Sequence, residues 1–396
     1  MTAPPPTRPG AGPDESRPAL FTAAFVRLSL ADLVYFSATG VAIYALPAYV
    51  TGPVGSDEAA AGLAFGAFAV TALVLRPFAG RLSDTRGRRP LLVGGALLAS
   101  VAMFLTAFAE TVPLIVALRL LFGAAEAAFF VASFAALADL APATRMGEAL
   151  SYNSLGLYLG LTLGPPLGEL LVSTIGFTGA WYGAAALLVI AAAVVSSIGE
   201  TRAPSEAPEA KAPLIHRPAL PAALGLLTSI LPVGGFLAFA ALYARDVGVA
   251  SSSLPLAVYG LVVVVCRVAF AKVPDRLPAL PLGAVSLLVI GVGLGLPAVS
   301  ATPTGLLIGA ALMGLGVSFS TPAFFTAIFA TASASQRGAA SGTASAMLDV
   351  GLGGGPIILG LVAESLGING AFGVGAAIAL TGCLWTLALA RRLTTA

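Results

Sequence analysis

The sequence predicts an all-α membrane protein with twelve transmembrane helices, arranged as two pseudo-symmetric six-helix bundles. Three observations carry this prediction. The chain of 396 residues is 58% hydrophobic and 10% charged, with a mean hydropathy of +0.97. It contains twelve apolar runs that are long enough to cross a bilayer. The last six runs repeat glycine, proline and charge positions of the first six at one fixed offset of 191 residues.

The apolar composition indicates that this fold is surrounded by lipid. A soluble domain carries about 25% charged residues, and this chain has too much apolar surface for a water-soluble core. A bilayer core of roughly 30 Å needs about 20 apolar residues per helix, and backbone groups in lipid must be paired within each segment. The predicted helices are 23–48, 60–82, 90–109, 113–138, 146–174, 178–198, 219–244, 253–273, 279–299, 304–330, 338–364 and 368–390.

The repeat relates the two halves without a gap over about 100 residues. The charged segment at residues 80–89 returns in reduced form after residue 271, and the pair Gly164-Pro165 returns as Gly355-Pro356. Internal repeats of this kind indicate a duplicated architecture. Other pairs at the same offset are Arg76 and Arg267, Gly123 and Gly314, and Gly176 and Gly367.

Charges divide the chain and orient it. Residues 1–20 form a Pro-rich tail that we expect to be disordered, and residues 199–218 form a polar linker between bundles at 21–198 and 219–396. Sixteen of the 20 Lys and Arg residues fall in the tails, the linker or the connections of one side. The positive-inside rule therefore predicts a cell-membrane protein with both termini in the cytoplasm. The same count assigns Arg76 and Arg267 to the inner ends of their helices.

Several classes of function are excluded by what the sequence lacks. No nucleophile–base pair, metal-binding cluster or phosphate-binding loop is present, so we expect no enzyme, no metal and no cofactor. The sole histidine, His216, lies in the linker, and Cys266 and Cys383 lie in separate apolar helices, which makes a disulfide unexpected. The net charge of +2 reflects membrane topology and gives no reason to expect nucleic acid as a partner.

Four ionisable side chains lie inside predicted transmembrane helices, namely Asp32, Arg119, Glu126 and Asp349. Each costs about 2.5–3.5 kcal/mol at the bilayer centre, so few chains keep one without use. Arg119 and Glu126 are seven residues apart, on one helix face but too far apart to pair directly. We interpret the four as proton-coupling residues. The alternative is a buried structural pair, or for Asp349 a cap on the glycine-rich packing that follows it.

Aromatic and polar side chains near these charges are candidates for substrate binding. An aromatic cavity with a few carboxylates suits an amphipathic or cationic organic ligand, and packing against lipid or other helices is the alternative for any single ring. Glu169 and five other carboxylates lie near outer helix ends, where we expect them to be solvated. The candidate binding residues are Tyr35, Phe36, Thr39, Phe122, Phe130, Asn153, Tyr158, Phe236, Phe239 and Phe325.

The connection between the second and third helices carries a motif. Residues 80–91 resemble the signature G-x-L-a-D-r-x-G-r-K/R, which lies at this place in the major facilitator superfamily. We expect the charges of this motif to form an ionic latch between the two halves on the inner side, together with charges at the inner end of the fourth helix. The gating residues expected here are Gly80, Asp84, Gly87, Arg88, Asp139 and Arg145.

The fourth and fifth helices extend the resemblance over the whole chain after residue 20. Arg119 and Gly123 match part of the fourth-helix motif, and residues 156–168 resemble the antiporter signature G-x-x-x-G-P-x-x-G-G, with Glu169 in place of its final Gly. Asp32 with Pro47 resembles the first helix of twelve-helix drug:proton antiporters. Glycine at every fourth position lets helix backbones approach closely. The gating residues expected in the fifth helix are Gly160, Gly164, Pro165 and Gly168.

The resemblance implies a secondary active transporter that works by alternating access. The antiporter-like motif and the buried carboxylates favour proton-coupled export of small amphipathic organic molecules or drugs. Import of a nutrient such as a sugar or organic acid with protons is one alternative, and a lipid flippase or a non-transporting scaffold is another. The expected partners are a small-molecule substrate, protons and the lipid bilayer, and the family default is a monomer.

Overall fold

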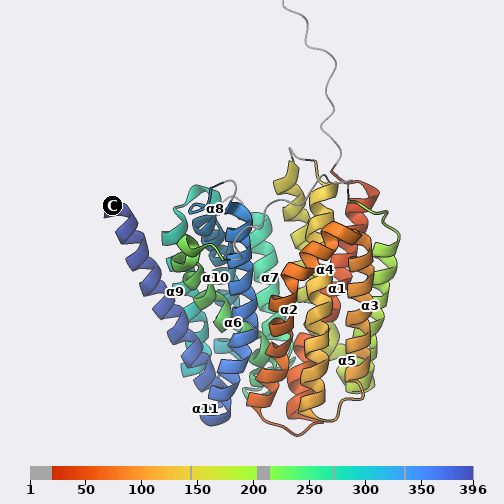
Figure 1. Ribbon diagram of the computed structural model, residues 1–396. Coiled ribbons are helices and arrows are strands. Elements are labelled where there is room, and N and C mark those ends of the chain that lie inside the picture. The colour runs from red at the N-terminus through yellow and green to blue at the C-terminus, as the bar shows by residue number, and fades with distance from the viewer. Residues whose placement is uncertain (1–19, 143–144, 203–214, 271–272, 334–335, 396) are drawn as a thin grey trace, which may run out of the picture.

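The computed structural model describes residues 20–142, 145–202, 215–270, 273–333 and 336–395. Over these residues every regular element is a helix (Figure 1). The elements are α1 (Ala23–Thr51), α2 (Glu58–Arg86), α3 (Arg88–Thr106), α4 (Val112–Leu140), α5 (Met146–Ser196), the 3-10 turn η2 (Arg217–Ala219), α6 (Leu220–Asp246), α7 (Leu254–Ala269), α8 (Val273–Arg276), α9 (Ala279–Val299), α10 (Pro303–Phe329) and α11 (Arg337–Thr395).

Glycines interrupt the two longest helices at equivalent places. Helix α5 is broken at Gly176, with φ 74° and ψ 178°, and α11 is broken at Gly367, with φ 72° and ψ 169°. The two residues are one repeat apart, and their positive φ is a conformation that favours glycine. Nine described helices are long and apolar enough to cross a membrane, and α7 is a shorter apolar helix. With α5 and α11 each counted as two segments, the described residues contain the twelve predicted spans.

Helix α2 is longer than its apolar run. It begins after Asp57, which accepts a hydrogen bond from the Ala60 N–H at 2.7 Å, and it ends before Gly87, whose φ is 103°. The run predicted for this helix ended at residue 82, so the last turn, which contains Asp84, is helical and not part of a loop. The extension places Arg76 well inside α2 instead of at its end.

The predicted run 253–273 is divided in the structure. Helix α7 ends at Ala269, and the single turn α8 begins at Val273. Pro274 lies in the first turn of α8, where proline is tolerated because the N–H groups of a first turn have no partner within the helix.

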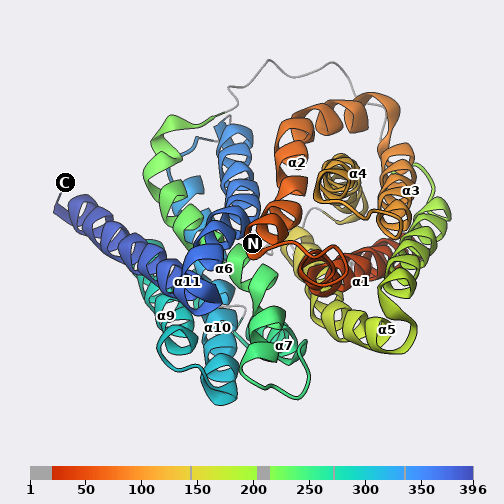
Figure 2. The same ribbon diagram turned by 90° about the horizontal axis from the view of Figure 1, so that it is seen from below.

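The helices form two bundles that lie side by side (Figure 2). Helices α1 to α5 make one bundle, in which α1 packs on α5 and α4 packs on α2 and α3, and helices α6 to α11 make the other. The bundles meet where α2 packs on α11, α5 on α7 and α1 on α6. This arrangement confirms the predicted fold class. The predicted tail lies outside the described residues apart from Leu20, as does most of the predicted linker, and the domain boundaries stay a prediction.

The glycines expected to act in gating hold α5 against α1. Gly160, Gly164 and Gly168 face the backbone of α1, and an added methyl group at Gly164 would overlap the Cα of Gly40. The helix continues through Pro165 without a break. In this conformation these residues set close packing within one bundle, and their part in gating stays a prediction.

One end of the molecule is closed by contacts between the bundles. We call the end where α1 passes into α2, at residues 52–57, the far end. The end where α2 passes into α3, at Gly87, is the basic end, because four arginines lie in residues 81–89. In the far half, Gly62 and Gly66 of α2 touch the backbone of Pro356 and Gly353 in α11, and added methyl groups would overlap those carbonyl oxygens. The bundles are therefore in backbone contact on this side.

Candidate functional site

Three charged side chains join the two bundles in the interior of the molecule. Nη2 of Arg76 lies 2.8 Å from Oδ1 of Asp349 and 3.3 Å from Oε1 of Glu126. Arg76 comes from α2, Glu126 from α4 and Asp349 from α11, so the bond between Arg76 and Asp349 crosses from one bundle to the other. The side chain of Asp349 is 3% exposed and that of Glu126 is 10% exposed. We call these three residues the charged cluster.

The hydrogen bonding of the charged cluster is incomplete. Oε2 of Glu126, Oδ2 of Asp349 and Nε of Arg76 are buried and have no hydrogen-bond partner among the described residues. One guanidinium therefore serves two carboxylates, and a proton on either carboxylate would leave Arg76 to pair with the other. Within the described residues no three His, Cys, Asp or Glu side chains gather as they would to hold a metal ion.

Arg119 lies on the same helix as Glu126 without bonding to it. Its guanidinium lies 4.8 Å from the centroid of the Phe122 ring and 5.1 Å from that of Phe68. The seven-residue spacing predicted that the two charges would not pair directly, and no ion pair joins them in the described part of the chain. Arg119 thus adds a second buried positive charge to the region through contacts with aromatic faces.

Asp32 lies apart from the charged cluster, in a polar site within one bundle. The Ser133 hydroxyl on α4 donates to both of its carboxylate oxygens at 2.9 Å, and the Asn153 amide on α5 donates at 2.7 Å. Ser29 in turn donates to the side-chain oxygen of Asn153 at 3.0 Å. The carboxylate on α1 is therefore tied to α4 and α5 by neutral donors, and Asn153 serves this site.

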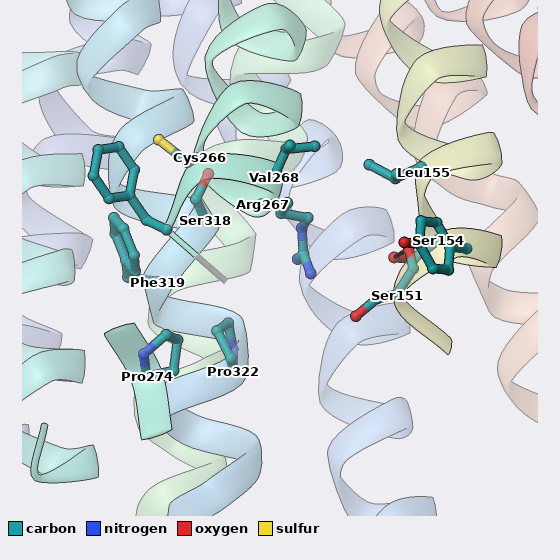
Figure 3. A pocket seen from close by; sticks show the side chains of 12 residues that line it. Ser151, Ser154, Leu155, Cys266, Arg267, Val268, Pro274, Ser318, Phe319 and Pro322 are labelled. Atoms are coloured by element: carbon teal, nitrogen blue, oxygen red, sulfur yellow. Dashed lines mark hydrogen bonds between the residues drawn. The ribbon is translucent and has the colours of Figure 1, made fainter. Parts of the chain in front are cut away.

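A cavity of about 300 Å³ lies between α5 of one bundle and α7, α8 and α10 of the other (Figure 3). Arg267 is the one charged side chain among its described lining residues. The Arg267 guanidinium lies 4.1 Å from the centroid of the Tyr158 ring. Ser151 and Ser154 from α5 and Ser318 from α10 bring hydroxyl groups to the lining. The cavity thus lies between the bundles and combines one cation with hydroxyl and apolar groups.

None of the ten predicted substrate-binding residues lines this cavity, although Tyr158 contacts Arg267. Tyr35 stacks on Phe129 at 3.9 Å between centroids, and Phe236 and Phe239 are fully buried in the apolar core of the other bundle. These rings fill space between helices, the alternative that the sequence left open for any single aromatic residue. The others, Phe36, Thr39, Phe122, Phe130 and Phe325, lie on α1, α4 and α10 and do not line the cavity either.

At the basic end, the expected latch lies inside one bundle. Arg88 binds Asp84 at 2.6 Å and Asp139 at 3.1 Å, and all three residues belong to the amino-terminal bundle. Arg145 pairs with Glu148 at 2.6 Å, and this pair also lies within the amino-terminal bundle. Among the described residues these three ion pairs do not cross between the halves, and the part of these charges in gating stays a prediction.

Glu200, in the segment that follows α5, binds the backbone at the start of α3. Its carboxylate accepts the backbone N–H groups of Arg88 at 2.8 Å and Arg89 at 3.2 Å, and it occupies the space that a side chain at Gly87 would need. Partial burial raises the pKa of the Glu200 carboxyl, but the backbone donors outweigh burial and hold this pKa below its ordinary value. The contact is therefore present at neutral pH and is lost only as the pH falls through this lowered pKa.

Glu169 links the bundles at the far end. Its carboxylate accepts the backbone N–H groups of Ser252 at 2.8 Å and Ser253 at 3.1 Å, and the hydroxyl groups of Ser251, Ser252 and Ser253. Tyr44 on α1 adds a hydrogen bond to Ser252 at 2.8 Å. The serines precede α7, so the carboxylate also meets the positive end of a helix dipole. The expectation that Glu169 is a solvated helix end is wrong, because its partners come from the opposite bundle.

Replacing Glu169 by Gln is expected to open the far end. A hydrogen bond to a charged acceptor contributes about 1.5–3 kcal/mol, and a neutral amide offers one weaker acceptor oxygen in place of two. Spin labels at Thr174→Cys and Ala250→Cys, in a cysteine-free background in liposomes, should report a distance distribution shifted to longer values. Glu148→Gln, which alters a carboxylate at the opposite end of the same helix, is the control. An unshifted distribution would show that Glu169 does not hold this end closed.

Sequence reasoning missed Arg76 and Arg267, which it assigned to helix ends. Both lie at contacts between the bundles, Arg76 on Asp349 and Arg267 on Tyr158. The sequence did contain a sign that these arginines have a role, because they occupy equivalent positions in the two halves, 191 residues apart. An arginine that both halves keep at one position inside an apolar run is a candidate for more than topology.

Comparison with known proteins shows similarity along the whole length of the chain. The Major Facilitator Superfamily model matches residues 28–303 and 222–395. An uncharacterized MFS-type transporter of Salmonella typhimurium is 27% identical over 372 residues, which cover 90% of this chain and 94% of that protein. An uncharacterized MFS-type transporter of Pseudomonas aeruginosa is 29% identical over an alignment 407 residues long, which covers 93% of this chain and 94% of that protein.

Solved structures show the same likeness of fold. A bacterial homologue of the human lysosomal transporter Spinster, in an inward-facing and occupied conformation, has a TM-score of 0.77 at 15% identity and covers 93% of this chain and 96% of its own. The nucleoside transporter NupG has a TM-score of 0.76 at 16% identity and covers 92% of this chain and 99% of its own. At these identities the likeness concerns the fold alone.

Proposed function

Because this chain belongs to the major facilitator superfamily of membrane transporters, we propose that it exports small amphipathic organic molecules in exchange for protons. It is a secondary transporter that works by alternating access, in which one bundle rocks against the other. The observation that carries the proposal is the charged cluster, because a titratable carboxylate of one bundle is bound there to an arginine of the other.

The ion pair between Arg76 and Asp349 stabilises one conformation of the carrier when no substrate is bound. It holds α2 to α11 through an ion pair at 2.8 Å, on the interface along which the bundles must move. A proton on Asp349 would remove the charge of the carboxylate and leave Arg76 to Glu126, a partner in its own bundle. Protonation therefore changes a contact between the bundles and not only one within a bundle.

The ion pair between Arg76 and Asp349 explains why substrate is exchanged for protons, and why neither crosses the membrane without the other. The deprotonated, empty carrier is held in one conformation by the ion pair, and either a proton on Asp349 or a bound substrate releases it. Exchange further requires that substrate binds when Asp349 is deprotonated, so that proton and substrate oppose each other's binding from different sites. Glu126 keeps Arg76 neutralised in the released state, so no unpaired guanidinium is left in the membrane.

Asp32 and Arg119 act in support of this exchange. Asp32 is a second buried carboxylate, and its neutral donors Ser133 and Asn153 allow it to carry or release a proton without breaking an ion pair. Arg119 adds a second buried positive charge to the helix that carries Glu126. We place the basic end in the cytoplasm by the positive-inside rule, with both termini there and the carrier acting as a monomer in the cell membrane.

Everted membrane vesicles from cells that produce the protein test the exchange. In a panel of amphipathic dyes, antibiotics and aromatic acids, we expect at least one compound to dissipate a preformed pH gradient, seen as recovery of the fluorescence of a pH-sensitive dye. Vesicles without the protein should not respond, and vesicles with Glu148→Gln should respond as the wild type does. The proposal is wrong if no compound dissipates the gradient. Uptake of a labelled nutrient driven by an inward proton gradient would instead favour import.

A further inference from the structure

The repeat pairs Arg76 with Arg267 and allows the surroundings of the two arginines to be compared. The two carboxylates of the charged cluster map by the same offset of 191 residues onto Val317 and Tyr158. The carboxyl-terminal bundle has thus kept the arginine, while both of the carboxylates that would neutralise it are replaced, one by an apolar side chain and one by a phenol.

Tyr158 takes the place of Asp349 in space as well as in sequence. Its ring comes from α5 and lies over the guanidinium of Arg267 on α7, so this contact also crosses between the bundles. An aromatic face attracts a guanidinium without neutralising its charge. Arg267 forms no ion pair with any other described residue, and its buried Nε has no hydrogen-bond partner there. Among the described residues, therefore, no carboxylate neutralises the positive charge of Arg267 at the wall of the cavity.

We propose that the cavity beside Arg267 binds an organic anion with an aromatic or apolar body. The anionic group of the ligand supplies the negative charge that the second site lacks, and the body of the ligand occupies the space between α5, α7 and α10. This inference names the substrate class of the proposed exporter and rests on that proposed function.

The lining of the cavity matches such a ligand. An arginine presents two parallel N–H groups to a carboxylate or sulfonate. The hydroxyl groups of Ser151 and Ser154 on α5 and of Ser318 on α10 line the cavity from opposite sides (Figure 3). Phe319 adds an aromatic ring. A volume of about 300 Å³ is at the small end of ligand pockets. A cationic ligand would meet Arg267 and no carboxylate among the described lining residues, so the cavity disfavours it.

Three ligands that share one aromatic body test the charge preference. Binding of 2-naphthoate, 2-naphthamide and 2-naphthylmethylammonium to the purified full-length protein in detergent is measured by equilibrium dialysis. We expect 2-naphthoate to bind at least about tenfold more tightly than the amide, and the ammonium compound most weakly. Arg267→Gln should weaken 2-naphthoate by about tenfold or more and change the amide by less than about twofold.

Two further variants separate charge from fold. Arg267→Lys keeps the positive charge but loses the planar guanidinium with its two parallel N–H groups. Its affinity for 2-naphthoate should therefore lie between those of the wild type and Arg267→Gln. Arg276→Gln removes an exposed arginine that does not line the cavity, and it should bind 2-naphthoate as the wild type does.

The charge of the cavity can also be measured without any ligand. With Ser154→Cys in a cysteine-free background, an anionic methanethiosulfonate reagent should label the wall faster than a cationic reagent of similar size. Arg267→Gln should reverse this order. Because the ratio of two rates is taken on one preparation, a partial loss of folded protein leaves it unchanged.

The outcomes keep this inference apart from the proposed function. Equal or tighter binding of the ammonium compound, no saturable binding of 2-naphthoate, or unchanged binding by Arg267→Gln would overturn the anion site. If 2-naphthoate binds through Arg267 while no compound moves protons in vesicles, the site stands and the proposed exchange is wrong. If only cations are exchanged for protons and 2-naphthoate does not bind, the exporter stands and the anion site is wrong.

Discussion

Replacing Glu126 by Gln is expected to abolish proton-driven transport and to preserve the exchange of substrate for substrate across the membrane. The amide has nearly the shape of the carboxyl group but cannot take up or release a proton. Arg76 would keep its bond to Asp349 at 2.8 Å, so the link between the bundles could no longer pass to a partner in the amino-terminal bundle. Proton-driven efflux in reconstituted liposomes should fall by about a hundredfold, a change of about 2.8 kcal/mol.

A matched control separates this effect from a loss of charge in general. Glu148→Gln removes an exposed carboxylate that is paired with Arg145 near the surface, and it should transport like the wild type because exposed pairs contribute little. Substrate exchange should persist in Glu126→Gln, which shows that the carrier still rocks. Proton-driven efflux at wild-type rates in Glu126→Gln would remove this residue from the coupling mechanism.

Replacing Arg76 by Gln is expected to destabilise the protein by about 3–5 kcal/mol, because two buried carboxylates lose their common cation. The loss should appear as a lower unfolding temperature of the purified protein in detergent. Adding Asp349→Asn to the same chain removes one of the stranded charges and should restore part of the loss.

The double variant makes this prediction specific to the charged cluster. In a double-mutant cycle, Arg76 and Asp349 should show a coupling energy well above the error of additivity of about 0.5 kcal/mol. Strictly additive effects would mean that the contact at 2.8 Å contributes nothing to holding the bundles together.

The helical spans and the duplication could be predicted from the sequence because the bilayer imposes length and apolarity on each helix. Even the breaks in α5 and α11 fell where predicted, between residues 174 and 178 and between 364 and 368, at Gly176 and Gly367. Asp32, Glu126 and Asp349 could be singled out because charged groups are costly in lipid.

The connections among these residues could not be read from the sequence. Hydropathy ended α2 at residue 82, but the polar residues that follow still form helix up to Gly87, and this moved Arg76 from the helix end to the interior. Glu169 finds its serine partners 82 to 84 residues further along the chain, and no local pattern encodes such a pairing. Phe236 and Phe239 are buried in the apolar core, and their part in substrate binding stays a prediction, because core packing and ligand contact require the same kinds of side chain.

Coupling through the charged cluster is tested most directly by counting the protons released when substrate binds. The first compound that dissipates the pH gradient in everted vesicles is added to purified protein in weakly buffered detergent, and the pH change is recorded. The wild type should release about one proton per bound molecule, as reciprocal linkage between proton and substrate requires. The double variant Glu126→Gln, Asp349→Asn should bind the compound and release none. Proton release that is absent in the wild type, or equal in the double variant, would contradict the account.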